Sequence, residues 1–388
     1  MNNLNPVTIT SSLIKCRSVT PEDGGAIDLI ERILLNSGFN CTRIDQNGIN
    51  NLFARWGKAE NGSTFCFNGH TDVVPPGAIE SWTHKPFSAV EENGYLYGRG
   101  AVDMKSAVAA FVSASIEYVE TYKPHGSIVI TITGDEEGEA KYGTLAILRW
   151  MKENNEHIDH CLVGEPTGKE YLGDTIKIGR RGSMTIKLIA FGLQGHVAYP
   201  EKAVNPLPAL ARLLLNLEKK SLDSGNEFFD PSSLAITSID TGNQTNNVIP
   251  EKGMATINIR FNNLHSDLSL KKWIRNQIRK VVKKTGVNID LEVKVSAQPF
   301  LSKPGDFSRI ISNVIKAETD IDPDLSTSGG TSDARFIQEY CPVVEFGLVG
   351  KTMHQTDENV EIKQIENLNI IYQKILKSYF DNFSTKNS

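Results

Sequence analysis

The sequence predicts an α/β protein built from two domains. One is discontinuous, with a mixed sheet flanked by helices, and the other is an inserted α+β domain with an antiparallel sheet and two helices. The chain has 388 residues, which is more than one compact core usually holds. Strand-like runs alternate with helical patterns in the first and last thirds. In the middle third, apolar and polar residues alternate instead, as in strands with one solvated face.

The strands of the discontinuous domain are predicted from short β-branched or aromatic runs. These runs are Asn51–Trp56, Thr64–Asn68, Ile128–Thr133, Cys161–Val163 and Val343–Phe346. Helical patterns lie between them, at Ala107–Tyr118 and Tyr142–Met151. Strands that alternate with helices indicate a mostly parallel or mixed sheet with helices on its faces.

The inserted domain is predicted from period-two alternation. The alternating runs are Met184–Ala190, Leu234–Ile239 and Met254–Phe261. One accompanying helix starts at Asn205-Pro206, a cap followed by proline at the first helical position. The other carries lysines and arginines around an apolar stripe. We therefore place the inserted domain at residues 182–295 and the discontinuous domain at residues 1–181 and 296–388.

Composition excludes several function classes. The net charge is -5, so nucleic acid is not an expected partner, and the basic run 271–284 is read as a solvated helix face. No apolar run reaches the roughly 18 residues that span a bilayer. The N-terminus lacks a signal-peptide pattern, so a cytoplasmic location is expected. The five cysteines are scattered without a C-x-x-C, which argues against a disulfide framework and against a thiolate zinc site.

Imidazole and carboxylate side chains recur at turns that follow strand-like runs, where α/β sheets place their sites. The candidate metal ligands are His70, Asp103, Glu137, Glu165 and His354. This nitrogen and oxygen donor set suits zinc, cobalt, iron or nickel, and a carboxylate readily bridges two ions. Two ions roughly 3.5–4 Å apart that share a carboxylate and an activated water form a hydrolytic centre. The ligand chemistry alone leaves open which residue binds which ion.

Two neighbouring residues have predicted roles beside the ligands. In His70-x-Asp72 the carboxylate can reach back to the ring N–H and fix the imidazole tautomer. Glu136 and Glu137 point in different directions in extended chain, so one can bind a metal while the other acts as a base. Taken singly, each of these segments is more often an ordinary turn. Their joint occurrence favours the functional interpretation.

Four motifs together resemble the zinc aminoacylase and carboxypeptidase family of metallopeptidases. They are Phe67–Pro75, Leu96–Lys105, Asp135–Gly138 and Gly164–Thr167. The resemblance extends over nearly the whole chain. It implies a zinc-peptidase-like fold, with the inserted domain forming a homodimer and acting as a lid. It also implies two Zn²⁺ ions per subunit, for which Co²⁺ can substitute.

The resemblance also implies individual roles. One zinc would be held by His70 and Glu165 and the other by Glu137 and His354, with Asp103 bridging both and followed by a cis peptide. Asp72 would orient His70, and Glu136 would be the general base and later the acid. His196 would reach from one subunit into the active site of the other and stabilise the oxyanion.

Further motifs resemble the family members that act on a succinylated diamino acid. They are Gly179–Ser183, Gln194–Pro200, Asn247–Pro250 and Ser328–Phe336. The implied reaction cleaves the succinyl amide of N-succinyl-LL-2,6-diaminopimelate to succinate and LL-2,6-diaminopimelate, in lysine and cell-wall precursor synthesis. Arginine grips carboxylate bidentately, so Arg180 and Arg260 are the predicted carboxylate-binding residues, while Arg181 fits a surface ion pair equally well. The predicted hydrogen-bonding residues are Ser183, Tyr199, Asn246, Asn247, Gly330 and Thr331.

Other functions remain as alternatives. Acetylornithine deacetylation, or hydrolysis of another N-acyl amino acid or a dipeptide, would use the same metal centre. A non-catalytic binding dimer is disfavoured, because all five ligands and Glu136 are present. Two positions depart from the family pattern. Ser106 stands where glycine is usual, and Gly350 stands where related enzymes often carry an asparagine that helps hold substrate.

Overall fold

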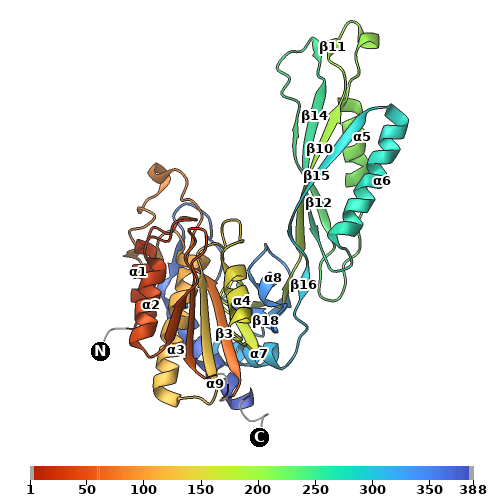
Figure 1. Cartoon of the computed structure of the whole chain (residues 1–388). Helices are drawn as coiled ribbons and strands as arrows, with labels where there is room; N and C mark the ends of the chain where they lie inside the picture. The colour runs from red at the N-terminus through yellow and green to blue at the C-terminus, as the bar shows by residue number, and fades with distance from the viewer. Residues whose placement is uncertain (1–3, 59, 61, 384–388) are drawn as a thin grey trace. The chain divides into compact units, whose positions relative to one another are not determined.

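In the computed structural model the chain folds into two compact units (Figure 1). The structure describes residues 4–58, 60 and 62–383, so the predicted outer limits at residues 1 and 388 lie outside the described residues. The first unit comprises the described residues up to Ile178, Ser302–Ser326 and the chain from Ser332 onward. The second comprises Gly179–Leu301 and Thr327–Thr331.

The second unit extends beyond the predicted insertion at residues 182–295. The chain enters it through β9 (Gly179–Arg180) and leaves it through β16 (Phe300–Leu301). These two strands pair antiparallel, with Phe300 opposite Arg180. Because of this strand pair, the unit begins before and ends after the alternating runs from which its limits were predicted.

An eight-stranded mixed sheet forms the first unit. Its strands, in spatial order, are β1 (Asn40–Arg43), β2 (Leu52–Gly57), β6 (Ser127–Thr133), β3 (Thr64–His70), β7 (His160–Val163), β18 (Val343–Glu345), β8 (Thr175–Lys177) and β17 (Asp324–Ser326). The central strands β6, β3, β7 and β18 run parallel to one another. Every residue of β3 and β6 is buried, as expected for a parallel sheet covered on both faces.

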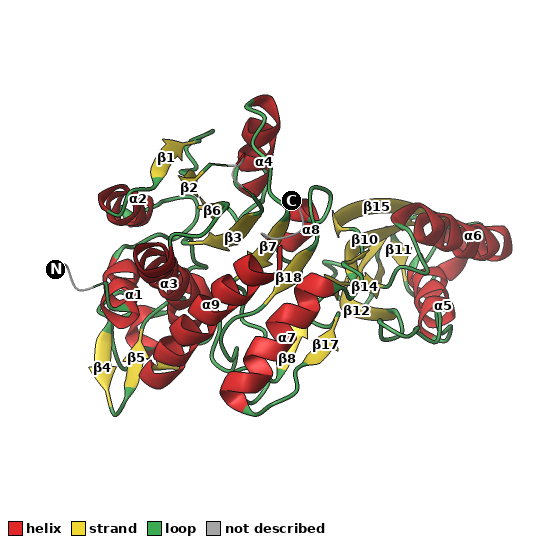
Figure 2. Cartoon of the chain, turned by 90° about the horizontal axis from the view of Figure 1, so that it is seen from below, coloured by secondary structure: helices red, strands yellow, loops and turns green. Residues whose placement is uncertain are grey.

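Helices cover both faces of this sheet (Figure 2). They are α1 (Pro6–Lys15), α2 (Ala26–Asn36), α3 (Ser106–Tyr122), α4 (Thr144–Glu153), α7 (Asp306–Thr319), α8 (Ala334–Ile337) and α9 (Ile362–Phe383). Figure 2 shows α3, α7 and α9 on one face and α4 and α8 on the other. The ring of Phe67 on β3 stacks on Phe111 of α3 with centroids 4.2 Å apart. The mixed sheet flanked by helices confirms the predicted fold class.

A smaller sheet lies beside the turn that carries Asp103. It consists of β4 (Val90–Glu92), β5 (Tyr95–Tyr97) and β19 (Asn359–Glu361). A short 3₁₀ turn at Ile79–Ser81 precedes it. After β5, Gly100 adopts a φ of +83° and starts a π-type turn at Ala101–Lys105. A positive φ is freely accessible to glycine, so this residue lets the chain turn sharply just before Asp103.

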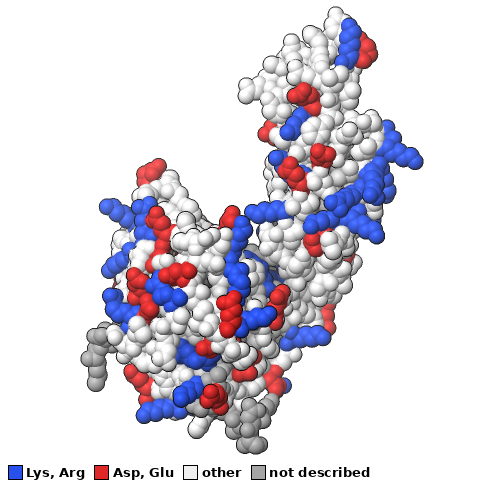
Figure 3. Space-filling view, in the orientation of Figure 1, with Lys and Arg blue, Asp and Glu red and all other residues white. Residues whose placement is uncertain are grey.

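The second unit has a four-stranded antiparallel sheet and two helices. The strands, in spatial order, are β12 (Ser233–Asp240), β14 (Lys252–Phe261), β10 (Gly182–Phe191) and β15 (Asn288–Ala297), and the helices are α5 (Leu207–Glu218) and α6 (Asp267–Thr285). Two further strands, β11 (Gly195–His196) and β13 (Val248–Ile249), pair with each other, and a 3₁₀ turn lies at Pro200–Lys202. The buried stripe Leu270, Ile274, Ile278 and Val281 joins α6 to the core of this unit. Lysines and arginines gather over the outside of α6 (Figure 3).

Strand β12 differs from its prediction. Alternation predicted one buried face, yet Ile236 is 37% and Ile239 63% exposed. β12 is an edge strand that pairs only with β14 in this sheet. Its residue pattern is therefore that of a half-buried strand, but only Leu234 packs against the core of this unit, while Ile236 and Ile239 stay exposed. Among the described residues, no helix is both long and apolar enough to cross a bilayer.

Candidate metal centre

The carboxyl ends of three neighbouring parallel strands bring acidic and imidazole side chains together. His70 is the last residue of β3, opposite Thr133 of β6. Glu136 and Glu137 follow β6, and Glu165 follows β7. Because parallel strands end at the same edge of a sheet, side chains that are distant in the sequence converge there.

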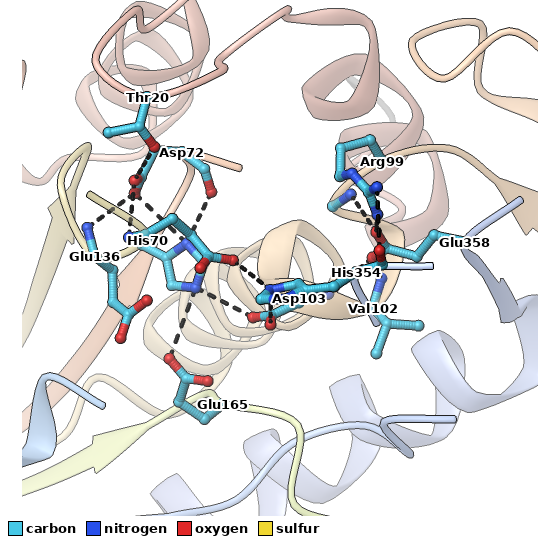
Figure 4. Close-up of polar contacts among 12 residues, drawn as sticks. Thr20, His70, Asp72, Arg99, Val102, Asp103, Glu136, Glu165, His354 and Glu358 are labelled. Atoms are coloured by element: carbon cyan, nitrogen blue, oxygen red, sulfur yellow. Dashed lines mark hydrogen bonds and ion pairs between the residues drawn. The ribbon is translucent and has the colours of Figure 1, made fainter. Parts of the chain in front are cut away.

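Asp103 lies between two imidazoles (Figure 4). Its Oδ1 is 3.2 Å from Nε2 of His70, and its Oδ2 is 3.2 Å from Nε2 of His354. Each oxygen therefore faces a different histidine, as a carboxylate shared by two ions requires. The peptide between Asp103 and Met104 is cis, as the resemblance implied.

Two donor groups share Asp103. The first is His70, Asp103 and Glu165, where Nε2 of His70 is 3.7 Å from Oε1 of Glu165. The second is Asp103, Glu137 and His354, where Nε2 of His354 is 2.7 Å from Oε1 of Glu137. Within each group, all donor atoms lie within 4.8 Å of one another. The structure therefore brings together all five predicted ligands, in the two sets that the resemblance implied.

A third group of close donor atoms contains His70, Glu136 and Glu137. Glu136 is thus near enough to serve either as a ligand or as a base for a molecule held between the two ligand sets.

Asp72 acts differently from its prediction. Nδ1 of His70 lies 2.9 Å from the main-chain oxygen of Asp72 and 3.6 Å from its Oδ1. The main-chain carbonyl, and not the carboxylate, therefore accepts the ring N–H and fixes the tautomer. The carboxylate instead accepts the amide N–H groups of Glu136 (3.2 Å) and Glu137 (3.1 Å). Sequence spacing could not distinguish these two arrangements, because it does not specify the direction of the main chain after β3.

The electrostatics of the cluster are those of a cation-binding site. Burial would lower the pKa of His70, but Asp103 and neighbouring carboxylates raise it well above its usual value. Hydrogen bonds to Asp103 and Glu137 raise the pKa of His354 to about 10. Burial favours protonated Asp103, yet the two histidines lower its pKa overall. The donor set contains imidazole and carboxylate without thiolate, and its negative charge would be neutralised by divalent ions, so these residues fit a two-metal centre.

The pKa of Glu136 is raised well above its usual value by burial and by the nearby charges of Glu165, Asp333 and Glu137. A carboxyl group that takes up a proton readily is suited to general base and acid work. Burial likewise raises the pKa of Asp72 to about 6.

The predicted substrate-binding residues all belong to the second unit. They are Arg180, Ser183, Tyr199, Asn246, Asn247, Arg260, Gly330 and Thr331. Arg180 is buried and donates a hydrogen bond from Nη1 to the main-chain oxygen of Gly330. Ser183 lies opposite Arg260 in the β10–β14 register. Within this unit, the structure brings these four residues into pairs.

His196 also belongs to the second unit, on β11, where it is exposed. Its Nδ1 accepts a hydrogen bond from the amide of Ala198 at 3.0 Å. Nε2 is therefore the nitrogen that carries the proton and can donate to a ligand.

The two departures from the family pattern fit locally. The hydroxyl of Ser106 donates to the main-chain oxygen of Ala101 at 2.5 Å, so the side chain is accommodated within the turn around Asp103. A Cβ at Gly350 would lie 3.3 Å from the sulfur of Met353. The space at Gly350 is thus partly occupied by a methionine that immediately precedes His354.

Sequence reasoning missed two residues with direct contacts to this centre. Thr20 donates its hydroxyl to Oδ2 of Asp72 at 2.7 Å. Glu358 accepts the amide N–H of Asp103 at 3.2 Å. The sequence carried little signal for either residue, because both contacts join segments far apart in the chain. Arg99, within the motif Leu96–Lys105, forms an ion pair with Glu358.

Comparison with known proteins agrees with this geometry. The sequence profile of the family described as Peptidase family M20/M25/M40 matches residues 66–378. A succinyl-diaminopimelate desuccinylase of Cereibacter sphaeroides is 56% identical over 377 residues, which cover 97% of this chain and 99% of that protein. A succinyl-diaminopimelate desuccinylase of Ruegeria pomeroyi is 54% identical, with the same coverage of both chains.

Solved structures share the fold. A tripeptidase from Staphylococcus aureus matches with a TM-score of 0.78 at 17% identity, covering 98% of this chain and 100% of that one. A dinuclear metal-binding peptidase of family M20 from Bacillus subtilis matches with a TM-score of 0.74 at 15% identity, covering 98% of both chains. The chain therefore belongs to the M20/M25/M40 family of metal-dependent peptidases and related hydrolases.

Proposed function

We propose that this hydrolase cleaves the succinyl amide of N-succinyl-LL-2,6-diaminopimelate, releasing succinate and LL-2,6-diaminopimelate. The observation that carries the proposal is the carboxylate of Asp103, whose two oxygens face two separate histidines at 3.2 Å. The identity of the substrate is inferred from relatives named succinyl-diaminopimelate desuccinylase. These relatives are 52–56% identical over nearly their full length.

The proposed ions are two Zn²⁺ per subunit, with Co²⁺ as a competent substitute. His70, Asp103 and Glu165 would hold one ion, and Asp103, Glu137 and His354 the other. Ions bound there would lower the pKa of a shared water and polarise the amide carbonyl.

Glu136 is the proposed base. Its carboxylate accepts a proton from the attacking water and later delivers that proton to the leaving amine. The carboxylate of Asp72 holds the amides of Glu136 and Glu137 and so orients the acidic loop. The carbonyl of Asp72 keeps the proton of His70 on Nδ1 and leaves Nε2 free to bind metal.

The second unit would supply substrate recognition. Burial and the nearby charge of Arg181 lower the pKa of Arg260, and a bound carboxylate would relieve that like-charge repulsion. Arg260 and Arg180 are the proposed carboxylate-binding residues. The other proposed contacts are Ser183, Tyr199, Asn246, Asn247, Gly330 and Thr331.

We further propose a homodimer formed through the second unit. Exposed Ile236 and Ile239 on edge strand β12 support this arrangement, because apolar edge strands pair readily with another chain. In such a dimer, His196 of the partner subunit would donate a hydrogen bond to the oxyanion that develops during attack.

A substrate panel tests the proposed reaction. Zinc-loaded protein is assayed with the succinylated substrate, N-acetylornithine and a dipeptide, each with and without chelator. The acetyl substrate lacks the distal carboxylate, so its kcat/KM should be lower by about 10²-fold or more. A faster acetyl substrate would contradict the substrate proposal, and full activity in chelator would contradict the metal centre.

A further inference from the structure

A buried ion pair connects the two segments that carry Asp103 and His354. Nη1 of Arg99 donates to Oε2 of Glu358 at 2.7 Å, across 259 positions of sequence. Arg99 is 3% exposed and Glu358 is fully buried. Figure 4 shows this pair next to the cluster of ligands, with neither side chain among them.

Glu358 fixes the main chain that leads into Asp103. Its carboxylate accepts the amide N–H groups of Gly100 (3.1 Å), Val102 (2.9 Å) and Asp103 (3.2 Å). Its main-chain oxygen also accepts the amide of Gly98 at 2.8 Å. One side chain and its own backbone thus hold four amides of the turn, which restricts the direction from which the Asp103 carboxylate projects.

Arg99 fixes the other segment. Its guanidinium donates to the main-chain oxygens of Gln355 (3.1 Å) and His354 (3.4 Å). The guanidinium also lies over the ring of Trp82, 5.1 Å from the ring centroid. His354 has a φ of +62°, an uncommon angle for a non-glycine residue that surrounding contacts help to hold. The hydrogen bonds from Arg99 are such contacts.

We infer that Arg99 and Glu358 form a positioning pair that sets the spacing of Asp103 and His354, and thereby the affinity of the metal site formed by Asp103, Glu137 and His354. This inference rests on the two-metal part of the proposed function. Removing a full charge from water is costly, so a buried ion pair is weak evidence for stability alone. Here the pair holds two ligand-bearing segments in place through hydrogen bonds, which an aliphatic pair could not form.

The two metal sites should differ in how strongly they depend on this pair. His354 belongs to one ligand set, whereas the set of His70, Asp103 and Glu165 does not include it. Loosening the segment that carries His354 should therefore weaken one site more than the other. A purely structural role would lower the stability of the whole unit and would not select a site.

The test measures zinc affinity in Glu358→Gln. Glutamine keeps the shape and one acceptor oxygen but removes the charge that pairs with Arg99. Chelator-treated protein is titrated with zinc in competition with a chromophoric chelator, which resolves the two dissociation constants. We expect the weakened site to lose about 10- to 100-fold in affinity, as for other residues that orient metal ligands. The affinity of the other site should change much less.

A double-mutant cycle identifies which of the two metal sites is weakened. In a His354→Ala background, Glu358→Gln should cause a much smaller further loss of zinc affinity, because Asp103 is then the only remaining ligand of the two that the pair positions. A matched control is Glu156→Gln, which breaks the Arg55–Glu156 pair (2.5 Å) elsewhere in the same unit. This control should lower the thermal midpoint and leave both zinc affinities unchanged.

The inference would be overturned if both zinc affinities of Glu358→Gln equalled those of the wild type. It would also be overturned if Glu358→Gln reduced zinc affinity as strongly in the His354→Ala background as in the wild type. If Glu358→Gln fails to fold, Arg99→Lys tests the inference instead. Lysine keeps the charge but cannot make the same set of hydrogen bonds. Unchanged zinc affinities in Arg99→Lys would again contradict the inference. Zinc affinity does not depend on which amide is cleaved, so failure of the proposed substrate leaves this result intact.

Discussion

The hydroxyl of Thr20 donates a 2.7 Å hydrogen bond to Oδ2 of Asp72, the carboxylate that holds the amides of Glu136 and Glu137. Thr20 lies in the segment after α1, and this segment runs alongside the end of β3. There, Ser18 donates its hydroxyl to the main-chain oxygen of Thr71 at 2.6 Å. The N-terminal segment therefore helps to order the loop that carries Glu136 and Glu137.

Replacing Thr20 with valine should impair turnover. Valine keeps the shape but removes the hydroxyl, which lowers the pKa of Asp72 by stabilising its ionised form. The pKa of Asp72 should then rise above its value of about 6, and the acid limb of the kcat profile should move to higher pH. We expect kcat near neutrality to fall by roughly tenfold.

Thr20→Ser is the control, because serine retains the hydroxyl and should leave the pH profile close to that of the wild type. Identical profiles for Thr20→Val and wild type would show that this hydrogen bond does not influence the acidic loop.

Glu136→Gln tests the proposed base. The amide cannot accept a proton from water, so kcat should fall by about 10²- to 10⁴-fold. Zinc content, measured by elemental analysis, should stay at the wild-type value, because Glu136 lies outside the two ligand sets. Glu139→Gln, in the exposed part of the same loop, should behave like wild type. Near-normal turnover of Glu136→Gln would disprove the assignment.

Metal binding should release protons. The folded-state pKa of His354 is about 10, raised from 6.5 by hydrogen bonds to Asp103 and Glu137. Metal-free protein therefore gains stability from protonated His354 that is fully present below pH 6.5 and is lost as pH rises through about 10. A metal ion needs the neutral imidazole, so binding at pH 8 must displace this proton.

Calorimetric titration with zinc, in buffers that differ in ionisation enthalpy, measures that release. We expect protons to be released at pH 8 and apparent zinc affinity to increase with pH. Binding without proton release would contradict a role of His354 as a ligand.

Arg260→Met tests substrate recognition separately from metal binding. Loss of a charged hydrogen bond to substrate carboxylate is worth about 1.5–3 kcal/mol, so kcat/KM should fall by roughly ten- to a hundredfold. Zinc affinity should not change, because Arg260 lies in the second unit. Arg275→Met, on the exposed face of α6, is the matched control. Equal kinetics for both variants would remove Arg260 from the binding site.

The sequence predicted the sheet and the ligands because their signals are local. Residue runs such as Thr64–Asn68 mark buried strands, and the strand ends place His70 and Glu165 at one edge of the sheet. Sequence spacing alone could not assign the ligands to individual ions. Asp103 and His354 are 251 positions apart, and only the fold brings them together.

Long-range polar contacts could not be predicted. Glu358 follows His354 by four positions, and nothing in that spacing indicates that its side chain turns toward the amide of Asp103. The carboxylate of Asp72 was assigned to His70 because the two residues are close in sequence, whereas the structure shows it accepting amides from the loop after β6. Side-chain direction in loops depends on main-chain angles that residue type leaves undetermined.

The most direct test of the two-metal account is a zinc titration of chelator-treated protein, with kcat/KM for N-succinyl-LL-2,6-diaminopimelate measured at each step. The account predicts that the protein binds two zinc ions per subunit and that activity, absent without metal, reaches its maximum only when the shared centre around Asp103 is filled. Full activity without bound metal, or two bound ions with no hydrolysis of the succinyl amide, would contradict it.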